Sequence, residues 1–298
     1  MLEEHQIHGD HWACLTDDVP ALLESWIPRV VEYGDMVEGE RDTFLEPGEA
    51  AGLAWPDIGL CALAIVAGTT DDDREGSDLV SAYPYVRGGI RHPIVIDEII
   101  PWENGYEGWV TGHLPGTDGP TITFFDTEFY ANRDLYDVGE TVEFEFAAVA
   151  YRADVGPPPP ITVDDPGRVR ELRAAMGAED DGSPLELSFD GASILYPREE
   201  MGPDSYEFIG TADAVEAVDV EELRLTETTD ATVWQLAATV LRLPLEEDED
   251  GGGAADYLFD VLVFVAEGRW AGEARPQPGD DTNGILWLIG RRADDAPA

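Results

Sequence analysis

Residues 141–151 read TVEFEFAAVAY, and this stretch indicates the fold class of the chain. Val142, Phe144 and Phe146 alternate with Glu143 and Glu145, so apolar side chains face one way and carboxylates the other. Alternation with a period of two is typical of a β-strand that is buried on one face. The sequence therefore predicts a sheet-rich protein around this segment.

Further strands are expected on both sides of this segment. Residues 83–152 have β character, with Asn104-Gly105 as the strongest hairpin signal and a second turn at residues 116–119. The small, apolar residues 52–68 predict a buried strand. Later strand candidates are residues 185–189, 208–220, 232–245, 257–264 and 284–290, although 211–225 also permits a helix.

Two helices are expected between these strands. Asp17 and Asp18 can cap a helix at residues 19–33, in which Pro28 should cause a kink or an end. The four prolines at 157–160 predict a stiff spacer, followed by a helix over 167–176 that Asp165 caps.

Together these features predict an α+β, mainly β fold with two small barrel-like, OB-like β units. The expected parts are an N-terminal α/β segment (1–82), a first β unit (83–156), a Pro-rich linker with a short helix (157–184) and a second β unit (185–298). A faint repeat supports two units, because a Gly-acid turn precedes the strand in both DVGE (137–140) and QPGD (277–280). Such turns are common in small barrels.

The charge of the chain indicates where it works. There are 64 acidic residues against 17 basic ones, all of them arginine, which gives a net charge of -47. Such a charge opposes the compact state in dilute buffer, whereas molar salt shortens the Debye length to about 3 Å and screens the repulsion. A hydrophobic content of 43% argues against disorder. We therefore expect a folded, salt-adapted, soluble protein.

The absence of membrane and targeting signals points to the cytoplasm. No apolar run approaches the roughly 20 residues of a spanning helix, and the N-terminus carries acids where a signal peptide is basic. We therefore expect a cytoplasmic protein without membrane contact. Double-stranded nucleic acid is not an expected partner, because counterion release needs a basic surface.

The segment FFDTEFYANRD (124–134) is the main candidate site. It gathers Asp126, Glu128, Asn132 and Asp134 after an expected strand, and such oxygens could hold a divalent cation or act as general acid and base. The alternative is that these are turn residues, since acidic clusters arise by chance in so acidic a chain.

Two weaker clusters stand elsewhere in the sequence. His5, His8 and His11, with Cys14 nearby, are transition-metal ligand types, but Gly9 interrupts a helix and the spacing does not match structural zinc sites. Arg168, Arg170 and Arg173 could bind phosphate or carboxylate, or could pair with neighbouring acids.

Residues 124–151 resemble a set of uncharacterised prokaryotic proteins. The shared pattern is F-F-D-T, then N-x-D-x-Y-x-x-G-E, then a strand that ends A-x-A-Y, and GILWLIGR (284–291) is similar to the ending of the same set. The resemblance implies a member of that family from an extreme halophile, and it implies no activity.

No phosphate loop, dinucleotide glycine motif, GxSxG elbow, HExxH or CxxC pair is present in the sequence. The leading hypothesis is therefore a non-catalytic binding or interaction module for a protein or a small ligand. The alternative is a hydrolase that depends on a divalent metal cofactor and uses Asp126, Glu128 and Asp134.

Overall fold

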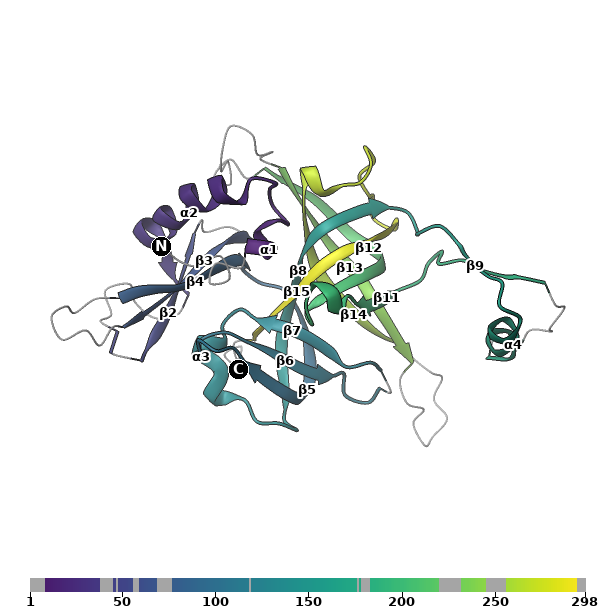
Figure 1. The fold of residues 1–298 in the computed structure, drawn as a ribbon, viewed down its shortest axis with the longest axis horizontal. Helices are drawn as coiled ribbons and strands as arrows, with labels where there is room; N and C mark the ends of the chain where they lie inside the picture. Colours follow the sequence, from purple (N-terminus) through teal and green to yellow (C-terminus); the bar gives the residue numbers. More distant parts are fainter. Residues whose placement is uncertain are drawn as a thin grey trace.

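The computed structural model describes residues 9–37, 45–46, 48–55, 59–68, 77–117, 119–175, 177, 183–219, 232–244 and 256–293. The described part is mainly β, with a helical segment near its start (Figure 1). Among the described residues, no helix is both long enough and apolar enough to cross a membrane.

A small layer forms the N-terminal part. Its elements are α1 (Gly9–Trp12), α2 (Val19–Tyr33), β1 (Asp35–Met36), β2 (Ala50–Trp55), β3 (Leu60–Gly68) and β4 (Ser77–Val86). The four strands form an antiparallel sheet in the order β1-β2-β3-β4. The strand expected over residues 52–68 is thus a hairpin of two strands, because the chain reverses between Trp55 and Leu60.

The predicted N-terminal helix is confirmed. Asp18 caps α2 by accepting a hydrogen bond from the backbone nitrogen of Ala21 at 3.2 Å. The buried side chains Leu22, Trp26 and Val30 lie on one face, as their spacing predicts. Pro28 does not end the helix, which continues to Tyr33.

A nine-stranded sheet forms the rest of the body. Its strands are β5 (Ile90–Pro101), β6 (Gly108–His113), β7 (Ile122–Asp126), β8 (Thr141–Val155), β11 (Ile194–Pro197), β12 (Ser205–Asp219), β13 (Thr232–Pro244), β14 (Asp256–Ala266) and β15 (Asp281–Arg292). The order is β11-β12-β13-β14-β8-β15-β7-β6-β5, with additional pairings of β12 to β15 and of β8 to β5. Short helical turns α3 (Phe129–Asn132), η2 (Arg133–Leu135), η3 (Glu199–Met201) and η5 (Glu267–Arg269) connect some of these strands.

The sheet repeats one pattern of pairing. In the first half β5 pairs with β6, β6 with β7, and β5 also with β8. In the second half β12 pairs with β13, β13 with β14, and β12 also with β15. Each first strand carries a register shift, after Ile96 in β5 and after Ala212 in β12. The two halves therefore have the same order of strands.

The turns before the fourth strands match as well. The Gly139 nitrogen donates to the Ile96 oxygen, and the Gly279 nitrogen donates to the Ala212 oxygen, both at 2.7 Å. Both glycines have positive φ angles, 89° and 94°. The Gly-acid repeat expected from the sequence is therefore present at equivalent places in the two halves.

The fourth strands of the two halves, β8 and β15, lie side by side and form a two-stranded ribbon that both halves share. β8 and β15 pair antiparallel over their length, with Ala148 opposite Leu288 near the middle. β14 of the second half pairs in parallel with β8, and β7 of the first half pairs in parallel with β15. As a result, the β units predicted at 83–156 and 185–298 do not form separate sheets. The third strand of each unit pairs with the long fourth strand of the other unit.

One predicted boundary falls inside a strand, and the next falls just after the end of a strand. β4 runs through the boundary expected after residue 82, so the N-terminal segment leads directly into the main sheet. β8 ends at Val155, immediately before the Pro-rich stretch. The following arm contains β9 (Ile161–Val163), α4 (Pro166–Ala175) and β10 (Leu185–Leu187), and it projects away from the body (Figure 1). Asp281 lies at both ends of the arm. Its backbone oxygen accepts a hydrogen bond from the Gly156 nitrogen, and its carboxylate accepts one from the Gly191 nitrogen.

Two apolar cores lie on opposite faces of the shared ribbon. Phe144, Phe146 and Ala148 of β8 belong to the core that both halves enclose. Ala147 and Val149 point the other way, into the core between the main sheet and the N-terminal layer. The predicted alternation at 142–146 thus sets the inner face, while the later residues of β8 are buried on both faces because the N-terminal layer covers them.

Candidate functional site

The segment after β7 forms a buried polar cluster. Asp126 ends the strand and is fully buried, and Glu128 and Asn132 are buried within the following turn. Asp126 accepts a hydrogen bond from the Tyr136 hydroxyl at 2.7 Å and another from the Glu128 backbone nitrogen at 3.0 Å. Each oxygen of its carboxyl group therefore accepts a hydrogen bond from within the protein.

Burial changes the acidity of this carboxyl group. The loss of water around Asp126 raises its pKa to about 7, although the bonds from Tyr136 and Glu128 oppose this change. Tyr136 in turn has a raised pKa because it is buried and lies beside the Asp126 charge. Asp126 therefore takes up a proton close to neutral pH.

Glu128 begins a chain of hydrogen bonds and ion pairs that joins four strands. It accepts from the Tyr85 hydroxyl of β4 at 2.7 Å and lies 3.4 Å from Arg291 of β15. Arg291 also pairs with Glu145 of β8 at 2.6 Å, and Glu145 pairs with Arg91 of β5 at 2.9 Å. The chain links the N-terminal sheet to the shared ribbon.

The four predicted site residues do not all meet. Asp126, Glu128 and Asn132 lie together, whereas the Asp134 side chain is 91% exposed and lies 4.0 Å from the Arg133 guanidinium. The Asn132 side-chain nitrogen has no hydrogen-bond partner within the described part of the chain. In that part no group of three or more His, Cys, Asp or Glu residues is arranged to hold a metal ion. The structure therefore brings three of the four predicted residues together and leaves Asp134 outside the cluster.

The histidine cluster is described only at its end. His5 and His8 lie outside the described residues. The His11 ring stacks on Trp287 with centroids 4.0 Å apart, and its Nδ1 lies 2.6 Å from the Tyr151 hydroxyl. Cys14 is buried, which raises the pKa of its thiol. His11 and Cys14 therefore contribute to the packing of the N-terminal layer on the main sheet.

The arginines of the third sequence candidate differ in their exposure. In α4, Arg168 is exposed, and Arg173 is buried with its guanidinium 2.9 Å from the Ser183 hydroxyl. The aromatic residues beside the candidate site, Phe124 and Phe125 of β7 and Phe129 of α3, are buried in the cores.

Sequence reasoning did not single out Asp204, a buried carboxylate in the loop before β12. Its Oδ2 accepts from the indole nitrogens of Trp109 at 2.9 Å and Trp287 at 2.8 Å. Trp109 belongs to the first half and Trp287 to the fourth strand of the second. Asp204 thus ties the two halves together, and no local sequence signal marks it because both partners are distant in the chain.

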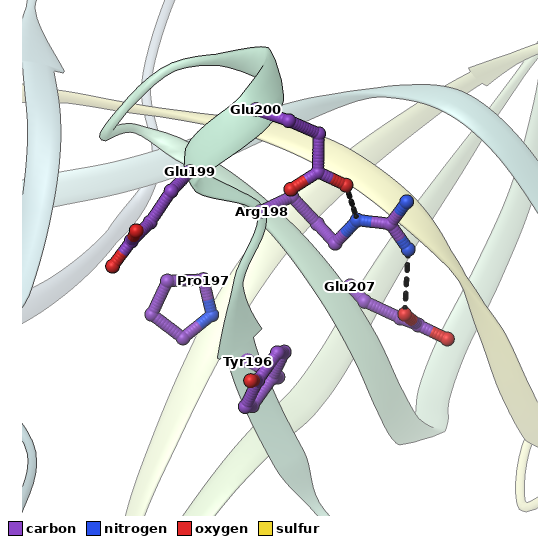
Figure 2. Close-up of a pocket in the computed structure, with 6 residues that line it drawn as sticks. All are labelled: Tyr196, Pro197, Arg198, Glu199, Glu200 and Glu207. Carbon is purple, nitrogen blue, oxygen red and sulfur yellow. Dashed lines mark hydrogen bonds and ion pairs between the residues drawn. The ribbon is translucent and has the colours of Figure 1, made fainter.

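A surface cavity of about 430 Å³ lies where β11 meets β12. It is lined by Tyr196, Pro197, Arg198, Glu199, Glu200 and Glu207. Figure 2 shows the Arg198 guanidinium between two carboxylates, 2.6 Å from Glu200 and 2.9 Å from Glu207, with Glu199 turned away. The Tyr196 side chain is 65% exposed. In a chain with 64 acidic residues, no sequence pattern marks these glutamates and this tyrosine as a binding site.

Comparisons with family models, curated proteins and solved structures gave no match to this chain.

Proposed function

We propose that this protein is a salt-adapted binding module without catalytic activity, built from two barrel-like, OB-like halves. Support comes from the pairing pattern, in which β5, β6, β7, β15 and β8 follow one another and return to β5. The same cycle runs through β12, β13, β14, β8 and β15. A closed order of five strands, in which the third strand is parallel to the strand that follows it in the order, is the arrangement expected of an OB-like barrel that holds ligands on its surface.

The cavity beside Tyr196 is the observation that carries a binding role. It combines an exposed aromatic ring with three carboxylates and a single guanidinium, so its lining has a net charge of about two negative units, three minus one. An aromatic face attracts a cation through its ring quadrupole. We propose an organic cation, such as a guanidinium or quaternary ammonium group of a small molecule or peptide, as the ligand.

The test is a thermal-shift titration in molar KCl with arginine ethyl ester and tetramethylammonium as probes. Molar potassium screens the carboxylates, so the Tyr196 ring should carry most of the binding that persists in KCl. A probe at a hundredfold excess over its Kd should stabilise the fold by about 2.7 kcal/mol.

Tyr196→Ala should abolish the shift, and Glu207→Gln should weaken it. Tyr33→Ala is the matched control, because the Tyr33 side chain is similarly exposed, at 58%, but lies on α2. An identical shift in wild type and Tyr196→Ala would contradict a cavity site. No shift with either probe would contradict the proposed ligand class.

A further inference from the structure

The two halves meet at two seams. Each seam is the place where the third strand of one half, β14 or β7, diverges from the long strand with which it pairs in the ribbon of β8 and β15. β14 pairs with β8 only from Leu262 to Phe264, and β7 pairs with β15 only at Phe125 and Asp126. At the earlier positions of β14 and β7 the ribbon offers no backbone partner. Each seam must therefore satisfy the backbone groups of its third strand in another way.

At both seams a side chain from the first strand of the opposite half takes that place. The Tyr206 hydroxyl of β12 accepts from the Thr123 nitrogen of β7 at 2.7 Å and donates to the Thr123 oxygen at 2.9 Å. His92 of β5 binds β14 similarly, because its Nε2 lies 3.2 Å from the Asp260 nitrogen and 2.9 Å from the Asp260 oxygen. The seams are alike in construction and differ in the side chain that closes them.

The difference matters because histidine, unlike tyrosine, is a residue type whose charge can change within the physiological pH range. Burial raises the pKa of Tyr206 to about 12, so its hydroxyl stays neutral in any physiological buffer. Histidine changes its charge between about pH 5 and 8. The Tyr206 seam is thus insensitive to pH, whereas the bond of the His92 seam depends on the protonation state of the imidazole.

The surroundings of His92 disfavour its charged form. The ring is 5% exposed and packs against Phe146 and Phe259, with centroids 6.1 Å and 4.7 Å away. The titratable groups that face it are Tyr257 and Asp260 of β14 and Glu143 of β8. Burial lowers the pKa of His92, and the Asp260 backbone and the two carboxylates oppose this only in part.

We propose that His92 is an acid-sensitive latch between the two halves, and that its protonation releases the start of β14 from β5. A neutral imidazole can accept a hydrogen bond from the Asp260 N–H through Nε2 while Nδ1–H donates to Tyr257. A protonated imidazole has no lone pair, so the Asp260 N–H loses its acceptor. The new Nε2–H can donate to the Asp260 oxygen, 2.9 Å away, but the positive charge is left between two phenylalanine rings. The second half opens at this seam while the Tyr206 seam stays closed.

The experiment is hydrogen exchange in molar KCl at pH 7.5 and at pH 5.5, expressed as protection factors so that the intrinsic pH effect is removed. We expect the protection of residues 256–261 to fall several-fold, up to about tenfold, at the lower pH, while residues 122–125 of β7 keep theirs. Asp126 also takes up a proton in this range, so the comparison is made in the Asp126→Asn variant as well. Equal loss at both seams, or no loss in β14, would overturn the proposal.

Two substitutions exchange the chemistry of the seams. His92→Gln offers an uncharged acceptor to the Asp260 N–H and should remove the pH dependence of β14. Tyr206→His should add a pH dependence to β7. If either variant fails to fold, an NMR titration of the His92 ring in the wild-type protein decides the matter. Protonation of His92 without a parallel loss of β14 protection would refute the latch.

Discussion

At the scale of single residues, distant polar side chains join the parts of this molecule. Asp204 binds one tryptophan from each half, and Glu128 binds β4 and β15. These groups are buried, and a buried polar group is costly unless it has a hydrogen-bond partner. Each such residue therefore favours one arrangement of the N-terminal layer and the two halves.

Asp126 gives a prediction on pH at this scale. Its folded pKa of about 7 lies above the ordinary value of 3.8, so between these values the folded state binds more protons than the unfolded state. Stability contributed by this group is complete below pH 3.8 and is lost as the pH rises towards 7. Asp126→Asn cannot ionise and should be more stable than the wild type at pH 8 by at least about 1 kcal/mol.

The measurement is urea unfolding in molar KCl at pH 4 and pH 8. The stability advantage of Asp126→Asn should be present at pH 8 and should shrink or vanish at pH 4. Asp134→Asn is the control, because that carboxylate is exposed and should show little change at either pH. An advantage of Asp126→Asn that is the same at both pH values would mean that ionisation of Asp126 does not strain the fold.

At the scale of elements, the repeated Gly-acid turn gives a prediction on two glycines. Gly139 and Gly279 both have positive φ, and an added Cβ would meet no atom within 4 Å at either position. Alanine should therefore destabilise the fold through the backbone alone, by about 1 kcal/mol at each site. The two effects should be similar, since the two turns make the same bond to a first strand.

Gly268→Ala provides the matched control for this pair. A Cβ at Gly268 also meets no atom within 4 Å, and its backbone does not need the left-handed region. Urea unfolding should show little change for Gly268→Ala. A loss at Gly139→Ala without a comparable loss at Gly279→Ala would show that the two turns are not energetically equivalent.

At the scale of the whole molecule, the net charge gives a prediction on salt. A net charge of -47 over one compact body repels itself strongly, and the repulsion is screened only when the Debye length falls to a few ångströms. We predict that the fold is lost as KCl falls below about 0.5 M. Tryptophan fluorescence and circular dichroism across a KCl series measure this, and an unchanged fold in salt-free buffer would contradict it.

Much of the local structure could be predicted from the sequence. The alternation in TVEFEFAAVAY predicts β8, Asn104-Gly105 predicts the β5–β6 hairpin, and Asp18 and Asp165 predict the starts of α2 and α4. These features depend on residues close in the chain, where propensity, capping and turn chemistry act. The candidate site was predictable only in part, because the position of Asp134 relative to Asp126 depends on the path of a turn.

The sequence by itself determined the charge, the strands and turns, and the Gly-acid repeat, because each is a property of adjacent residues. Only the tertiary structure decided that the two halves share β8 and β15, that Asp204 bridges two tryptophans, and that His92 and Tyr206 close matching seams. These contacts join residues far apart in the chain, and no local pattern specifies which distant strand will complete a sheet. The physical reason is that backbone hydrogen bonds are the same for every pair of strands, so the choice of partner depends on how the whole core packs.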